Sequence, residues 1–167
     1  MPRVAFDALP RDGRLWVFGA ERALDADEET LVLAEVDQFL EGWKAHGVPL
    51  RGARTLREGR FVMVGVDVSG VSPSGCSIDA MVRLLRELEA RLGVGLVDYD
   101  PVYYRTDSGE VRRVARPEFR RLGEAGEVGP HTRVLDTTLT RIGNLEEGWE
   151  RPARETWHAR LLPTERI

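Results

Sequence analysis

Apolar residues recur at helical spacing in two stretches of the chain. The first stretch, residues 25–47, opens with a cluster of acidic residues and ends at Gly47, shortly before Pro49. The second stretch, residues 77–93, ends at Gly93. A repeat near 3.6 residues predicts an amphipathic helix in each stretch, because the apolar positions then share one face. These positions are Val32, Val36, Phe39, Leu40 and Trp43 in the first stretch and Ile78, Met81, Val82, Leu85, Leu88 and Leu92 in the second.

Four shorter stretches are interpreted as β-strands. They lie at residues 15–18, 50–59, 60–68 and 95–105. The third run is almost continuously apolar, which is typical of a central strand, and Glu58–Gly59 before it indicates a hairpin turn. The order of elements is therefore strand, helix, strand, strand, helix, strand. This βαββαβ order predicts an α+β, ferredoxin-like split βαβ body over residues 1–105.

Residues 106–167 are richer in turn residues than the body. The expected elements there are strands near 111–115 and 132–142 and helices at 117–122 and 153–162. A segment of this length is near the lower limit for independent folding. We therefore expect a turn-rich, β-containing extension that packs on the body.

The amino-acid composition excludes several classes of protein and several kinds of partner. The 167 residues carry a net charge of −4, so nucleic acid is not expected as a partner. A single cysteine excludes an intrachain disulfide and a Cys-based zinc site, and the three histidines lack metal-site spacing, so no metal or other cofactor is expected. No apolar run reaches the ~20 residues of a membrane helix, and the first residues lack the apolar core of a signal peptide. These features predict a cytoplasmic protein without a membrane segment.

The only cysteine lies in the loop at residues 70–79, whose sequence is GVSPSGCSID. In a βαββαβ sheet, the end of the first helix and the start of the second helix lie at the same edge. The topology therefore predicts that His46 lies close to this loop, and Arg14, before the first strand, is expected at the same edge. The candidate site residues of the loop are Ser72, Ser74, Gly75, Cys76, Ser77 and Asp79.

Two kinds of function fit this edge. Amides at a helix N-terminus bind anions, so the loop, its serines and Arg14 predict a ligand-binding or regulatory module for a small anion. Alternatively, the helix terminus favours the thiolate of Cys76, His46 takes its proton and Asp79 orients the imidazole. That arrangement predicts a cysteine-dependent enzyme, and a serine at position 76 would abolish catalysis while preserving binding.

A purely structural role also explains the loop. A free cysteine is often buried and fills space, and Ser77 suits the N-cap position of the second helix. In that case the loop turns the chain and holds no ligand.

The C-terminal sequence GWERPARETWHARLL offers a third function. Its Trp149 and Trp157 predict either an aromatic surface for a protein partner or apolar anchors that hold the extension in place. Ferredoxin-like sheets often associate through an exposed face, so a homodimer is a further alternative.

Four segments carry a resemblance that covers nearly the whole chain. The segments RLWVFGAERAL, FLEGWKAHGVPL, SGCSID and GWERPARETWHARLL resemble an uncharacterised bacterial family whose members are often labelled "ABC transporter ATPase". An ATPase of that kind needs a glycine-rich loop that ends in Gly-Lys-Ser/Thr. The only lysine here is Lys44, which does not follow a glycine, so the label does not describe the chemistry of this chain.

Residues 103–136 are similar in rhythm to bacterial GYF-like domains. The pattern runs from an aromatic pair, through a short hairpin and a helix, to a turn. Its matching positions are Tyr103, Tyr104, Gly126, Val128, Pro130, Thr132 and Val134. The resemblance implies a peptide-binding fold, but the Gly-Pro-Phe element that helps to build the peptide groove in related eukaryotic modules is absent.

Overall fold

A computed structural model describes residues 3–164 of the chain. The protein is α+β, and its strands form small antiparallel sheets. It divides into two compact units. Unit 1 comprises residues 3–98 and 137–147, and unit 2 comprises residues 99–136 and 148–164. The division therefore follows residue 98 instead of residue 105, and segment 137–147, which was expected in the extension, belongs to unit 1.

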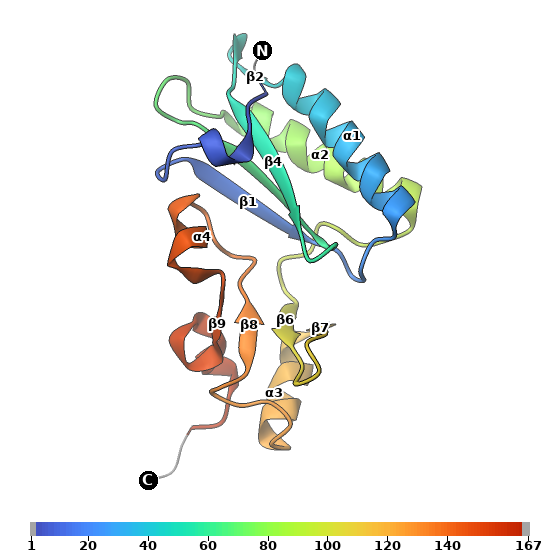
Figure 1. Ribbon diagram of the computed structural model, residues 1–167, viewed down its shortest axis with the longest axis vertical. Coiled ribbons are helices and arrows are strands. Elements are labelled where there is room, and N and C mark those ends of the chain that lie inside the picture. The colour runs from blue at the N-terminus through green and yellow to red at the C-terminus, as the bar shows by residue number, and fades with distance from the viewer. Residues whose placement is uncertain (1–2, 165–167) are drawn as a thin grey trace. The chain divides into compact units, whose positions relative to one another are not determined.

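The sheet of unit 1 has three antiparallel strands. β1 (Arg14–Gly19), β5 (Phe61–Val66) and β4 (Gly52–Arg57) lie in the order β1-β5-β4 (Figure 1). Every residue of β5 is buried, as its continuous apolar run predicted. Glu58 and Gly59 both have positive φ, and the hairpin between β4 and β5 turns there as expected.

Two helices cover one face of this sheet. α1 (Ala26–Glu41) and α2 (Gly75–Leu92) pack on the strands with their apolar stripes inward (Figure 1). Asp25 and Glu28 form a capping box that begins α1, and Gly93 with φ 67° ends α2. The buried core between helices and sheet includes Phe18, Val32, Val36, Leu40, Trp43, Leu50, Val62, Val64, Met81, Leu85 and Leu88.

The expected fourth strand does not join this sheet. Within residues 95–105, only β6 (Val102–Arg105) is a strand, and it pairs with strands of unit 2. The bends at Tyr99, Asp100 and Pro101 interrupt the stretch before β6 begins. At the first residues of β1, residues 140–141 lie alongside instead: Arg14 and Arg141 form an isolated antiparallel bridge.

The first helix is shorter than its apolar stripe suggested. α1 ends at Glu41, and the chain then forms a two-residue hairpin from β2 (Lys44–Ala45) and β3 (Val48–Pro49). His46 and Gly47 form the turn with φ values of 51° and 77°, a conformation that histidine and glycine tolerate better than most residues. The apolar stripe predicted a helix that was too long, because Trp43 is buried although it lies beyond the end of α1. Shorter elements of the chain are η1 (Phe6–Ala8) and α4 (Gly143–Gly148).

Unit 2 contains a four-stranded antiparallel sheet. β7 (Val111–Val114), β6, β8 (Arg133–Leu135) and β9 (Glu150–Pro152) lie in the order β7-β6-β8-β9, and α3 (Arg116–Glu124) packs against it (Figure 1). The strand and helix expected near 111–115 and 117–122 are confirmed. Of the strands expected near 132–142, β8 is the one that forms within that range. The expected last helix consists of two 3-10 turns, η2 (Ala153–Glu155) and η3 (Trp157–Leu161).

Candidate functional site

A hollow in unit 1 contains many of the residues expected at the sheet edge. The end of α1, the β2–β3 hairpin and the first turn of α2 enclose about 820 Å³, and this space is called the groove below. Five of the candidate residues line it: His46, Ser74, Gly75, Cys76 and Ser77. Residues that are 30 positions apart in the sequence therefore share one surface, with His46 in the hairpin turn instead of at a helix end.

The first turn of α2 is held by a reciprocal pair of serines. Ser74 is the N-cap, so the expectation that Ser77 holds that position is wrong. The Ser77 amide donates to the Ser74 hydroxyl at 3.2 Å, and the Ser74 amide donates to the Ser77 hydroxyl at 2.7 Å. The Ser77 hydroxyl also donates to the Ser74 carbonyl at 2.8 Å. Both side chains are thereby engaged in starting the helix, which leaves them less available for a ligand than the sequence suggested.

Aromatic side chains that were expected only in the core form a wall of the groove. Trp43 is 2% exposed, and its indole Nε1 donates to the Ser77 carbonyl at 2.8 Å. The ring of Phe39 packs against that of Trp43 with a centroid distance of 5.5 Å. This hydrogen bond and this packing fix the wall relative to the first turn of α2.

The lining of the groove includes two basic residues. Lys44 and His46 are both exposed, and neither forms an ion pair within residues 3–164. No aspartate or glutamate belongs to the described lining of the groove. The lining thus contains Lys44 and no carboxylate, which favours an anion over a cation.

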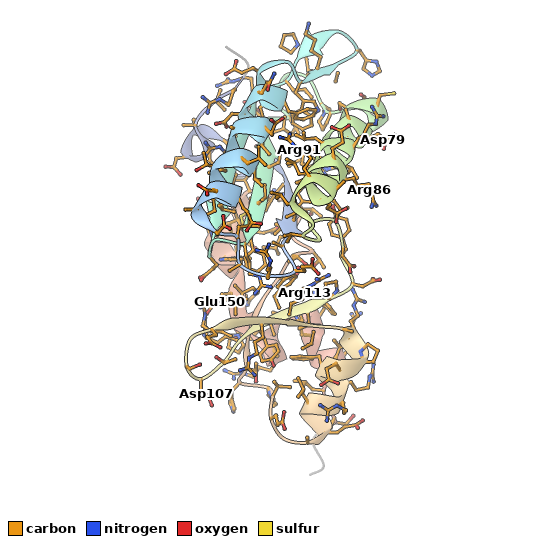
Figure 2. The ribbon with its side chains drawn as sticks, turned by 90° about the vertical axis from the view of Figure 1, so that its right-hand side faces the viewer. Asp79, Arg86, Arg91, Asp107, Arg113 and Glu150 are labelled. Atoms are coloured by element: carbon orange, nitrogen blue, oxygen red, sulfur yellow. The ribbon has the colours of Figure 1, made fainter. Side chains whose placement is uncertain are left out.

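The proposed catalytic group of Cys76, His46 and Asp79 is not assembled. Cys76 is exposed, but no hydrogen bond in the described part of the chain joins its thiol to the His46 imidazole. Asp79 projects from α2, where Arg86 follows two turns later, and it is not among the groove residues (Figure 2). The structure thus brings two of the three side chains to one groove and leaves the third outside.

A second hollow of about 390 Å³ holds the remaining two candidates, Arg14 and Ser72. Asp12, Thr140 and Arg141 also line it. Its lining includes Pro73, and the lining of the groove begins at Ser74, so consecutive residues border the two spaces. Sequence reasoning missed Arg141 because only the bridge to Arg14 brings it there. Lys44 could have been predicted from the sequence, since it lies two residues before His46.

Unit 2 contains a smaller hollow of about 300 Å³ beside Tyr104, His131 and several arginines. Glu150 neutralises two of these arginines: Arg105 donates to it at 2.6 Å and Arg133 at 2.9 Å. The hydrogen bond from Arg105, followed by that from Arg133, lowers the pKa of Glu150 despite its partial burial. Figure 2 labels Glu150 in this region. The positive charge of this hollow is therefore largely balanced within the protein.

The C-terminal aromatic residues pack within unit 2. The Trp157 ring stacks on His158 at 3.9 Å, and the Arg116 guanidinium lies 4.6 Å from the centre of the Trp157 ring. The Trp157 indole also donates to Asp136 at 3.3 Å. These contacts favour the anchoring role of Trp157 over an exposed aromatic surface.

No protein-family model, curated protein or solved structure matches this chain. Among residues 3–164, no group of three or more His, Cys, Asp and Glu side chains is arranged to hold a metal ion. The same residues include no helix with the length and apolar character needed to cross a membrane.

Proposed function

We propose that the protein is a binding module for a small anionic ligand with an aromatic or acyl body, and that the groove is its binding site. The observation that carries this proposal is the combination of an aromatic wall, formed by Phe39 and Trp43, with two basic side chains and no acidic one in the described lining. The apolar body would lie on the wall, where burial of apolar surface provides affinity. Lys44 and His46 would face the negative group.

A pair of fluorescent probes tests both parts of the ligand. 8-Anilino-1-naphthalenesulfonate carries an aromatic body and one negative charge, and N-phenyl-1-naphthylamine is similar in body but neutral. We expect saturable binding of both probes, tighter for the anion. Lys44→Gln should weaken the anion roughly two- to fivefold, the size of one exposed charge interaction, and leave the neutral probe unchanged. His46→Asn removes a hydrogen-bond donor and should also weaken the anion more than the neutral probe. Asparagine suits this variant because it also tolerates the positive φ of the turn.

Two further variants give the experiment its controls. Arg86→Gln on α2 removes a positive charge away from the groove and should change neither probe. Phe39→Leu removes the ring but keeps an apolar side chain, and it should weaken both probes. Equal loss of both probes in the lysine and histidine variants, or no saturable binding to the folded protein, would contradict the proposal.

A cysteine-dependent enzyme is a second candidate, favoured by the fact that Cys76 and His46 line the same groove. Alkylation by iodoacetamide separates it from simple binding. An activated thiol should react at pH 7 faster than glutathione, and His46→Asn should slow the reaction. A rate equal to that of glutathione in both proteins, with probe binding intact in Cys76→Ser, favours the binding module.

A protein-interaction role for the C-terminal part is the third candidate. Tyr103 and Tyr104 lie in β6, and a hairpin, a helix and the turn at residues 126–132 follow in the order on which the GYF-like resemblance rests. Deletion of residues 106–167 would also remove segment 137–147 of unit 1, so substitutions in unit 2 make the test. A partner captured by the full chain and lost in Arg112→Ala or His131→Ala, two exposed residues of the unit 2 hollow, would support this role. The ferredoxin-like relationship of unit 1, the cytoplasmic location and the homodimer stay predictions, and light scattering after size-exclusion chromatography tests the last of them.

A further inference from the structure

We infer that Arg14 and Arg141 form a second binding site, separate from the groove, for a compact dianion of the phosphate monoester class. The site is the hollow of about 390 Å³ that these arginines share with Ser72 and Thr140. It goes beyond the proposed function, because it recognises charge through an arginine pair and needs no aromatic wall.

The backbone holds the two arginines side by side. The Leu15 amide donates to the Thr140 carbonyl, and the Ile142 amide donates to the Gly13 carbonyl, both at 2.9 Å. These two bonds flank the Arg14–Arg141 bridge, which makes it a non-hydrogen-bonded antiparallel pair. In such a pair the Cα atoms approach to about 4.5 Å and the side chains leave the same face. The two guanidinium groups therefore start from neighbouring positions.

This pairing of like charges is unfavourable in the absence of a ligand. Within the described residues, neither Arg14 nor Arg141 forms an ion pair. Asp67, which precedes Val68 of the hollow, is engaged elsewhere: its carboxylate accepts bonds from the amide and hydroxyl of Ser69 and lies 3.7 Å from Arg51. The charge of the arginine pair is thus left for an anion from solution.

The orientation of the donors suits a tetrahedral anion. The Arg14 guanidinium lies over the Trp16 ring at 4.8 Å, which fixes its plane. Arginine presents several N–H donors in a planar fork that matches phosphate oxygens. Ser72 and Thr140 add two hydroxyl groups that have no hydrogen-bond partner in residues 3–164, unlike the capping serines of α2. Two positive charges and two free hydroxyls favour a dianion over a monoanion.

Asp12 gives the inference a sharp internal control. It lines the same hollow but forms no ion pair with either arginine among the described residues. Its negative charge would oppose an anion there. Removing that charge should therefore strengthen binding. If a ligand were held only by the general charge of the surface, its affinity would change little on a single substitution.

The experiment is a titration of the full chain with methyl phosphate, followed by ¹H–¹⁵N NMR at pH 7.5 and constant ionic strength. We expect saturable shifts confined to the amides of residues 13–15, 72 and 140–142. Arg14→Gln and Arg141→Gln should each weaken binding about tenfold, because each removes charge-assisted hydrogen bonds. Asp12→Asn should tighten binding about threefold, the effect of one nearby charge. Methyl sulfate, which has a similar shape but a single charge, should bind at least several-fold more weakly than methyl phosphate.

The controls separate this site from the groove. Arg86→Gln removes a charge on α2 outside both hollows, and Lys44→Gln removes one from the groove; both should leave methyl phosphate binding unchanged. If one arginine variant fails to fold, the other and Asp12→Asn still decide the question. Absence of saturable shifts, equal affinity for methyl sulfate, or no response to Asp12→Asn overturns the inference, and none of these results bears on the fluorescent probes.

Discussion

His158 illustrates how burial decides the behaviour of a single side chain. It is 1% exposed, stacks on Trp157 and shares a 2.7 Å hydrogen bond between its Nδ1 and the Thr156 hydroxyl. Burial lowers its pKa to about 4; Asp136 acts in the opposite direction, and Arg116 adds to the decrease. The sequence offered no reason to separate this histidine from the exposed His46.

The lowered pKa of His158 makes the stability of the protein depend on pH in a defined window. Between pH 6.5 and about 4, the unfolded chain binds a proton at this residue and the folded protein does not. The free energy of unfolding should therefore fall as the pH falls through this window, by up to about 1.4 kcal/mol per pH unit. Urea unfolding at several pH values measures the slope, and NMR titration of the imidazole gives its pKa directly.

His158→Gln supplies the matched control for this titration. The variant lacks the ionisable group, so the difference in stability between wild type and variant should change between pH 6.5 and 4 and be constant above that range. A difference that does not vary with pH, or an imidazole that titrates near 6.5, would show that the side chain is accessible to solvent.

Among the secondary-structure elements, the first turn of α2 links the fold to the candidate site. Its capping box uses the two serines that sequence analysis assigned to ligand binding. Ser74→Ala removes the acceptor for the Ser77 amide and should lower the free energy of unfolding by about 1 kcal/mol. Urea unfolding measures this loss.

Ser72→Ala is the comparison for the capping variant. Ser72 lies in the same loop and is exposed, and its hydroxyl makes no hydrogen bond within the described residues, so stability should change by less than about 0.5 kcal/mol. Equal stability losses in the two variants would mean that the capping box contributes little to the start of α2.

In the molecule as a whole, three distant parts of the chain meet at Gly65 in β5. A Cβ atom at this position would lie 2.5 Å from Leu9 Cδ1 and 2.7 Å from Ile142 Cδ1. The glycine thus allows the segment after η1 and the segment at 137–147 to pack closely on the sheet. This packing explains why residues from the second half of the sequence belong to unit 1.

Gly65→Ala should destabilise the protein by roughly 1–3 kcal/mol, because both neighbouring side chains must move. Ile142→Val removes the nearer part of one neighbour, so the double variant should be more stable than the sum of the two single effects predicts. Chemical denaturation of the four proteins gives the coupling free energy.

Gly70→Ala is the control for the overpacked position. No atom lies within 4 Å of a Cβ placed there, and its φ is not in the left-handed region. Its stability should match or slightly exceed that of the wild type. A neutral Gly65→Ala variant, or strict additivity with Ile142→Val, would contradict the packing described here.

Local patterns were sufficient for the parts of the fold that depend on neighbours in sequence. The buried strand at 61–66, the turn at Glu58–Gly59 and the helix at 75–92 follow from an apolar run, a glycine and a 3.6-residue repeat. The same logic failed where an apolar residue is buried for other reasons. Trp43 extended the expected helix into the hairpin, and the stretch at 95–105 suggested a fourth strand that the bends at 99–101 interrupt.

The sequence by itself determined the α+β class, most of the helices and strands, and the proximity of His46 to the loop at 70–79, because connections in a βαββ unit fix which element ends share an edge. Only the tertiary structure decided that Arg141 lies beside Arg14, that residues 102–105 belong to another sheet, and which serines are engaged in capping. The physical reason is that periodicity reports burial of a face, whereas pairing between distant segments depends on shape and hydrogen bonds that no local pattern encodes.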